Sequence, residues 1–310
     1  MSDFNQLKYF FRLLTLLGIL PVWNINKRKL QATRRCKLHS LVMLILVTII
    51  YISTIVSRQI YMFPIRKSTI ISTDTIYDFS EYVLNVLSIC QTNYFATKKL
   101  EMVLNGLRFK DKKLVRHQCV AIIFNHLLIF FLTFYDCYIW LIEHKISIAK
   151  QIMYLGYIQR YHVQLVVLLL YVLIGAIEVK YRSFNVFLLD CLSKFNVKER
   201  TTFFMEVSKE RDQDLVNVPT YCDMRDTFKL YSEIGNLLET FNDVFGWIIF
   251  LVIINSFTVI LSSVNFVIIQ LGAIRDLHMD DVHNIVIMTM WTLLGVVSRS
   301  SNTLRAIIGI

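Results

Sequence analysis

Long stretches without a charged residue constrain this chain more than any other feature. Residues 38–57, 117–135, 161–177, 244–274 and 282–298 contain no Asp, Glu, Lys or Arg, and the longest of these stretches covers 31 positions. A helix needs about 20 mostly apolar residues to cross the hydrocarbon core of a bilayer, and a charge at its centre costs about 3 kcal/mol. Each of the five stretches is therefore predicted to be a membrane-spanning helix.

A sixth and weaker candidate span covers residues 82–97, which are uncharged but less apolar. Its polar side chains are those of Asn85, Ser88, Gln91, Thr92 and Asn93. Polar groups at membrane depth face other helices or water rather than lipid. We therefore expect this span to lie in the interior of a six-span bundle.

The composition agrees with a membrane protein and excludes several other classes. Of the 310 residues, 55% are apolar and 18% are charged, which is more apolar surface than one soluble core of this size can bury. Only three prolines and nine glycines interrupt the chain, so long helices are expected. The sequence has no Gly-rich phosphate loop and no G-x-S-x-G, H-E-x-x-H or C-x-x-C motif. It therefore predicts no enzyme, no cofactor and no metal site.

The distribution of basic residues predicts the orientation in the membrane. Of the 33 Lys and Arg residues, 26 lie in residues 1–37, 97–117, 179–242 and the tail after 298, and seven lie in the other connections. Basic connections stay in the cytoplasm, so the N-terminus is predicted to be cytoplasmic. A G-protein-coupled receptor has the opposite orientation. The net charge of +10 is explained by anionic membrane lipid beside the span ends, and no nucleic-acid partner is expected.

Apolar residues also recur at helical spacing outside the spans. The stripes at 184–195 and 224–245 predict that helices four and five extend into the cytoplasm, and a shorter stripe at 100–107 predicts a further helix. These stripes form either a cytoplasmic helical bundle or lipid-surface helices. The apolar stretch 13–20 is expected to be a short membrane-surface helix rather than a cleaved leader.

The predicted fold class is therefore all-α, a polytopic membrane helical bundle with six spans. Residues 1–37 form a cytoplasmic N-terminal segment and residues 299–310 a short C-terminal tail. Residues 38–298 form the six-span bundle, which includes the cytoplasmic helical connection 179–242.

Polar and aromatic residues collect where three of the spans reach the outer side of the membrane. The candidate ligand-binding residues are Tyr77, Glu81, Tyr82, Asp136, Trp140, Tyr154, Tyr157 and Arg160. Ionisable groups inside spans pair with one another or line water-filled cavities, so Arg160 is expected to pair with Asp136 or Glu81. Phenols and carboxylates suit a polar ligand such as a sugar. The alternative is an interfacial aromatic belt with an ion pair that only fixes helix packing.

Two histidines, His126 and His162, lie inside predicted spans. Each is a candidate proton or metal site, but no second ligand lies at metal-binding spacing. A histidine that is hydrogen-bonded between helices is the favoured interpretation.

Three short motifs add a family resemblance to this pattern. They are FRLLTLLGILPVW at 11–23 with the basic run at 27–29 after it, YSEIGNLLETFNDVFGW at 231–247, and SSNTL at 300–304. In this order around six spans with an inner N-terminus, the chain resembles the insect gustatory receptors, which are relatives of the insect odorant receptors.

The resemblance implies a ligand-gated cation channel, formed as a homo- or hetero-tetramer with other gustatory receptor subunits. It also implies recognition of a small-molecule tastant in the outer half of each subunit, and a plasma-membrane location on the dendrite and cell body of a sensory neuron. Family members continue into a seventh, pore-lining span, whereas only residues 306–310 follow Arg305 here. We therefore expect no ligand-gated current from this chain alone.

Three other interpretations stay open at this point. The missing seventh span favours a non-conducting accessory subunit or a truncated isoform. A secondary transporter is a weaker alternative, because it predicts inverted internal repeats and helices broken by Gly or Pro, and neither is visible in the sequence.

Overall fold

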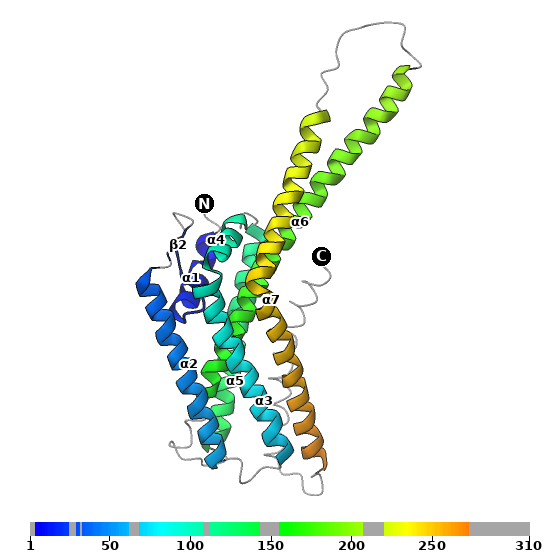
Figure 1. The fold of residues 1–310 in the computed structure, drawn as a ribbon. Helices are drawn as coiled ribbons and strands as arrows, with labels where there is room; N and C mark the ends of the chain where they lie inside the picture. The colour runs from blue at the N-terminus through cyan, green and yellow to red at the C-terminus, as the bar shows by residue number, and fades with distance from the viewer. Residues whose placement is uncertain are drawn as a thin grey trace.

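A computed structural model of the protein describes residues 4–24, 29–31, 33–61, 68–107, 112–142, 155–206 and 220–272. Helices dominate these residues, as predicted, and a two-stranded antiparallel ribbon is the exception (Figure 1). The elements are α1 (Phe4–Leu16), β1 (Val22–Asn24), β2 (Lys29–Gln31), α2 (Arg34–Tyr61), α3 (Ser68–Cys90), the π-helical segment η2 (Gln91–Phe95), α4 (Thr97–Gly106), α5 (Lys112–Ile142), α6 (Gly156–Glu206) and α7 (Thr220–Gly272).

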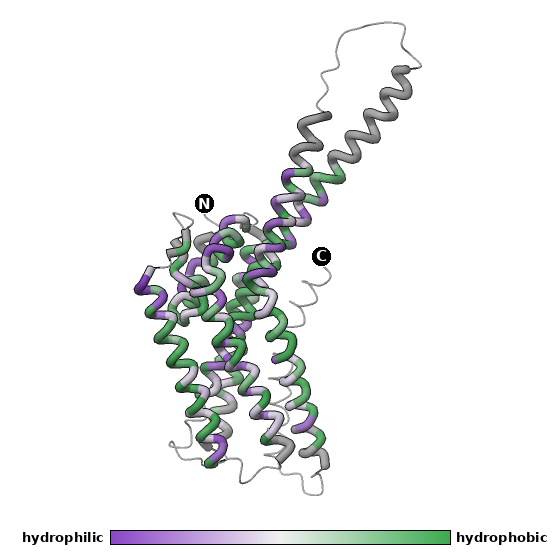
Figure 2. The backbone as a smooth tube through the Cα atoms, viewed as in Figure 1, coloured by the Kyte–Doolittle hydropathy of each residue, from purple (hydrophilic) through white to green (hydrophobic). Residues whose placement is uncertain are grey.

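Four of the long helices are apolar enough to cross a membrane, and they contain four of the six predicted spans. The candidate spans are Arg34–Ile60, Val115–Tyr135, Gly156–Leu189 and Thr227–Asn265. Apolar residues cover most of their length (Figure 2). The chain is therefore a helical membrane protein. The span predicted at 282–298 lies outside the described residues.

Helix α6 is the centre of the bundle. Of its most apolar 18-residue window, 78% is buried by protein, against 22–28% for the other three candidate spans. The residues from Val163 to Leu173 are apolar on nearly every side, as a helix surrounded by other helices must be. The remaining spans turn one face to α6 and its neighbours and leave an apolar face for lipid.

Helix α3 corrects the limits of the predicted sixth candidate span. The predicted span starts at residue 82, because Glu81 directly precedes the uncharged stretch. The helix itself begins at Ser68 and contains three acidic residues. Its Asn85 and Ser88 are fully buried, as are Thr92 and Asn93 of η2, which confirms that this segment faces other helices.

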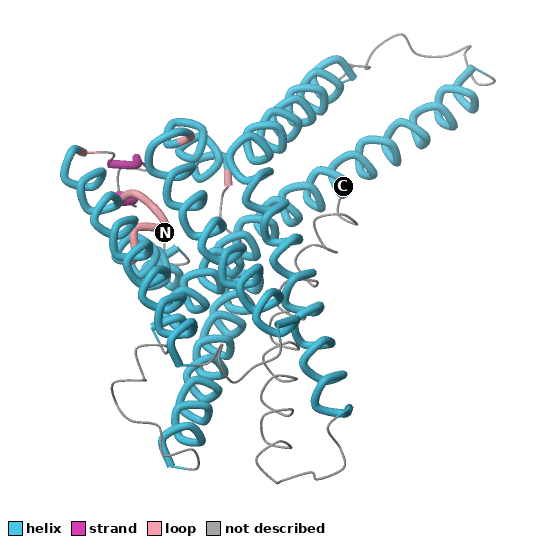
Figure 3. Tube along the Cα trace, turned by 60° about the horizontal axis from the view of Figure 1, so that its bottom comes forward, coloured by secondary structure: helices cyan, strands magenta, loops and turns pink. Residues whose placement is uncertain are grey.

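The two predicted helical extensions are present. Helices α6 and α7 are 51 and 53 residues long, and both run beyond the rest of the bundle (Figures 1 and 3). The ring of Phe184 on α6 lies 6.1 Å from that of Tyr231 on α7, so residues of the two predicted stripes contact each other. The extensions therefore pack together where they leave the bundle.

The stripe at 100–107 also packs against protein. The residues that form it, Leu100, Val103, Leu104 and Leu107, are at most 3% exposed. The helix lies on α7, and Gly106 allows the close approach, because a Cβ atom there would lie 2.9 Å from a methyl group of Leu237. This stripe forms a helical bundle within the chain rather than a lipid-surface helix.

The N-terminal helix α1 corrects a second expectation. Its face of Leu7, Phe10, Phe11 and Leu14 is buried in the main core, and Ile19 and Leu20 follow it there. The expectation that residues 13–20 form a membrane-surface helix is therefore wrong, because this segment packs against protein. An amphipathic pattern shows that one face is buried, but it does not distinguish lipid from protein as the covering layer.

Candidate functional site

One face of helix α3 is polar and is turned toward the interior of the bundle. The inward residues recur every three or four positions, continue into η2 and are at most 8% exposed. They are Asp74, Asp78, Glu81, Asn85, Ser88 and Thr92. By contrast, Ile76 and Phe79 on the outer side are each more than half exposed. Such an arrangement suits a helix with lipid outside and a polar site inside.

The first ion pair of the site joins α3 to α2. Arg58 Nη1 lies 2.5 Å from Asp78 Oδ2, and the Asp78 side chain is 7% exposed. In the sequence, Arg58 only marks the end of the first uncharged stretch, so this pair was not predicted. A usable signal was present, because Arg58 directly follows one predicted span and Asp78 lies shortly before the next, so an antiparallel pair of helices brings them to the same depth.

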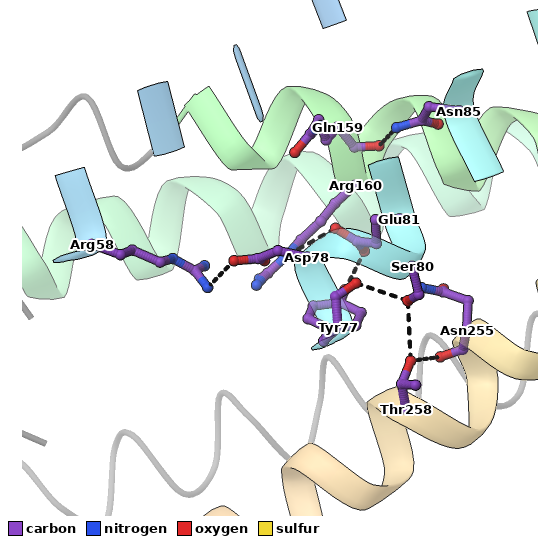
Figure 4. Close-up of polar contacts among 10 residues, drawn as sticks. All are labelled: Arg58, Tyr77, Asp78, Ser80, Glu81, Asn85, Gln159, Arg160, Asn255 and Thr258. Atoms are coloured by element: carbon purple, nitrogen blue, oxygen red, sulfur yellow. Dashed lines mark hydrogen bonds and ion pairs between the residues drawn. The ribbon is translucent and has the colours of Figure 1, made fainter. Parts of the chain in front are cut away.

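The second ion pair joins Glu81 of α3 to Arg160 of α6 (Figure 4), and two aromatic rings lie beside it. Arg160 Nε lies 4.0 Å from Glu81 Oε2, and the Tyr77 phenol donates a hydrogen bond to the same carboxylate. The guanidinium carbon of Arg160 lies 5.3 Å from the ring centre of Tyr77 and 5.4 Å from that of Tyr157. The positive charge therefore lies between two π faces and a carboxylate.

A ladder of polar contacts joins α3 to α7. Asn255 Nδ2 donates to Ser80 Oγ at 2.6 Å, and Ser80 Oγ lies 3.2 Å from Thr258 Oγ1 (Figure 4). Further along the two helices, Ser262 Oγ donates to Asp74 Oδ1 at 3.0 Å. The side of α3 that faces α7 is therefore hydrogen-bonded along several turns.

The structure brings half of the predicted site residues together. Tyr77, Glu81, Tyr157 and Arg160 form one cluster, which we call the Arg160 cluster, and Glu81 is one of the two partners expected for Arg160. The sequence predicted that Tyr77 and Glu81 lie at the outer end of a span. They lie instead in the middle of α3, because this helix begins at Ser68.

Of the other four predicted residues, the structure describes the side chain of Tyr82 alone. Tyr82 faces α2, where its ring stacks on Tyr51 at 4.3 Å and its hydroxyl lies 3.3 Å from Thr48 Oγ1. Tyr154 lies outside the described residues, and so do the side chains of Asp136 and Trp140.

Two amide atoms beside these contacts have no hydrogen-bond partner among the described residues. They are Gln159 Nε2, next in sequence to Arg160, and Asn255 Oδ1, and both residues are at most 2% exposed. A buried donor and a buried acceptor of this kind are suited to water or a polar ligand. Within the part of the chain that the structure describes, no group of His, Cys, Asp and Glu is placed to hold a metal ion.

The histidines differ in their surroundings. His162 Nδ1 lies 2.8 Å from Asn85 Oδ1 on α3, which confirms an interhelical histidine. His126 Nδ1 instead lies 2.7 Å from the Ile122 carbonyl of its own helix, while its ring meets Tyr161 of α6 edge-on. The sequence pattern could not separate these two cases, since both residues lie within apolar spans.

Comparison with known proteins identifies the family. The model of the 7tm chemosensory receptors matches residues 7–306, which include nearly all of the described helices. No curated protein and no solved structure gives a significant match. Receptors of this family are not enzymes. The chain belongs to the 7tm chemosensory receptor family, in agreement with its resemblance to the insect gustatory receptors, and is a membrane-embedded chemoreceptor.

Proposed function

We propose that this chemoreceptor is a taste receptor that detects a small polar tastant through the Arg160 cluster and opens a cation channel. The observation that carries the proposal is the charge placed between helices α3 and α6, where Arg160 lies between two tyrosine rings and the buried Glu81 carboxylate. Ionisable groups at membrane depth are expensive, and they mark sites of ligand or ion recognition.

The chemistry of the cluster favours a ligand with several hydroxyl groups. Tyr77 and Tyr157 offer flat ring faces, and Gln159 offers a buried donor that no described residue satisfies. Sugars combine apolar C–H faces with hydroxyls that donate and accept, so they match this combination of rings and polar groups.

The resemblance to gustatory receptors supports the wider assignment. We place the receptor in the plasma membrane of a sensory neuron, on its dendrite and cell body. We also place it in a homo- or hetero-tetramer with other gustatory receptor subunits, with membrane lipid around its exposed apolar faces.

The proposed orientation gives the first prediction. A reporter fused to the N-terminus, or inserted within 198–214, is expected to be shielded from membrane-impermeant reagents in intact cells, because the basic excess keeps both segments in the cytoplasm. Labelling is measured before and after permeabilisation. Labelling of the N-terminal tag in intact cells would contradict the proposed orientation.

The second prediction separates a ligand site from a packing contact. Arg160→Met is expected to reduce surface expression strongly, because it removes the cation beside the buried Glu81 carboxylate. The double variant R160M/E81Q is expected to recover expression, because it removes both charges. If the cluster recognises the tastant, the double variant still fails to respond.

The measurement uses cells that also express a full-length gustatory receptor subunit, with fructose, glucose and sucrose as probes. Surface labelling and ligand-evoked current are recorded for each variant. Tyr82→Phe is the matched control, because it removes a tyrosine hydroxyl from α3 on the side that faces α2. Recovery of both expression and current in the double variant would show that the pair only fixes packing.

A further inference from the structure

The end of α1 is held by side chains from three other parts of the bundle, in contacts that the Arg160 cluster does not include. Four consecutive carbonyl groups, those of residues 16–19, each lie against a polar side chain. The contacts are Leu16 O with His39 Nε2 (2.9 Å), Leu17 O with His162 Nε2 (3.2 Å), Gly18 O with Asn93 Nδ2 (2.8 Å) and Ile19 O with Thr92 Oγ1 (2.5 Å). We call this set the carbonyl clasp.

The clasp has a local cause in the way α1 ends. The last carbonyls of a helix have no partner within the helix. Here the chain turns at Gly18, which has a φ of 71°, and the amides of Gly18 and Ile19 bond back to the carbonyls of Thr15 and Leu14. The turn satisfies those two carbonyls and leaves the next four to side chains from outside the helix.

The π-helical segment η2 supplies two of those side chains. Thr92 and Asn93 are neighbours in sequence, yet both reach the same loop, at Ile19 and Gly18. In an α-helix successive side chains diverge by about 100°. The wider turn of η2 reduces this divergence, and π-turns of this kind are common at functional sites. We infer that the π conformation serves the clasp.

His162 connects the clasp to α3. Its Nδ1 lies 2.8 Å from Asn85 Oδ1, and its Nε2 faces the Leu17 carbonyl. Asn85 Nδ2 donates to the Gln159 carbonyl (Figure 4). This bond fixes the amide so that its oxygen faces the His162 ring. Both ring nitrogens therefore face oxygen atoms. A neutral imidazole has one N–H group, so it donates to only one of these two oxygens at a time.

We propose that His162 is a two-position contact that links the packing of α3 on α6 to the docking of the N-terminal segment. When the ring donates to Asn85, it ties α6 to α3. When it donates to Leu17, it holds the clasp closed. On α3, Glu81 lies about one turn from Asn85, and on α6, Arg160 lies about half a turn from His162. A shift of α3 against α6 at the Glu81–Arg160 pair therefore changes which oxygen the His162 ring binds. The inference rests on these contacts and stands without the proposed ligand.

The test is hydrogen exchange measured by mass spectrometry on the full chain in lipid nanodiscs, at one fixed pH. His162→Phe is expected to speed exchange in a peptide covering residues 13–20 by on the order of fivefold, the effect of one lost hydrogen bond. Asn85→Leu is expected to slow exchange there, because the single N–H of the ring is then left for Leu17. His126→Phe is the control and leaves this peptide unchanged, since the hydrogen bond of His126 is to a carbonyl of its own helix and not to the clasp.

The sign of the Asn85→Leu effect decides the inference. Faster exchange in residues 13–20 would show general loosening and would overturn the two-position contact, as would no change in His162→Phe. Thr92→Val provides a second route if either variant fails to fold, because it removes the hydroxyl that contacts Ile19 and that also accepts from Asn93 Nδ2. It is expected to speed exchange in the same peptide, and an unchanged rate would show that the clasp does not hold the segment.

Discussion

Replacing Arg58 by Met is expected to lower the free energy of unfolding by about 3–5 kcal/mol, the range found when one partner of a buried ion pair is removed. The reason is that Asp78, whose side chain is 7% exposed, keeps its charge inside the bundle but loses the cation 2.5 Å away. The double variant R58M/D78N is expected to regain most of this loss, because no uncompensated charge stays buried.

The measurement is unfolding in detergent micelles, followed by tryptophan fluorescence. Arg182→Met is the matched control, because Arg182 contacts Glu178 at a similar distance of 2.6 Å but its side chain is 75% exposed. An exposed pair of this kind contributes about 0.3–0.5 kcal/mol. Equal losses for the two arginines would show that burial does not set the strength of the Arg58–Asp78 contact.

Gly18→Ala is expected to destabilise the protein by about 2–5 kcal/mol. A left-handed backbone costs a residue with a side chain about 1–2 kcal/mol, and overpacking adds about 1–3 kcal/mol. Both apply here, because Gly18 has a φ of 71° and its Cβ would lie 2.9 Å from Met43 Cβ. Exchange in residues 13–20 should rise with the loss of stability, since the turn orients the clasp carbonyls.

Replacing Gly235 by Ala is expected to have the opposite effect on stability. It lies exposed inside α7, and a Cβ atom added there would have no neighbouring atom within 4 Å. Gly235→Ala is therefore expected to stabilise α7 by about 1 kcal/mol, the difference in helix propensity. Thermal unfolding gives the stability of both variants relative to the parent protein. A Gly18→Ala protein as stable as the parent would show that the turn at Gly18 does not require a glycine.

The spans that the sequence predicts well are those where burial in lipid is the main requirement. Length and absence of charge identified α2, α5, α6 and α7, because these properties are what a bilayer demands of any single helix. The same rule set the wrong start for α3. Its acidic residues are tolerated because Arg58 and Arg160 lie on neighbouring helices, and a single-helix rule does not include neighbours.

In the candidate site too, the sequence predicted what a single helix determines and missed what depends on neighbouring helices. Residue type and depth led to Tyr77, Glu81, Tyr157 and Arg160, which do cluster. Which side of a helix faces which neighbour is a property of the packed bundle, and so Tyr82 was grouped with the residues of the Arg160 cluster, although its ring stacks on Tyr51 of α2. The contacts of Asn85 with α6 depend in the same way on the rotation of two helices about their axes.

The inward polar face of α3 has a consequence for how the chain enters the membrane during synthesis. Each of Asp74, Asp78 and Glu81 would disfavour insertion of an isolated helix by up to about 3 kcal/mol near the bilayer centre. Arg58 leaves the ribosome before α3, whereas Arg160 follows some eighty residues after Glu81. The translocon therefore receives α3 with only one of its two arginine partners, so its stable integration awaits the synthesis of α6.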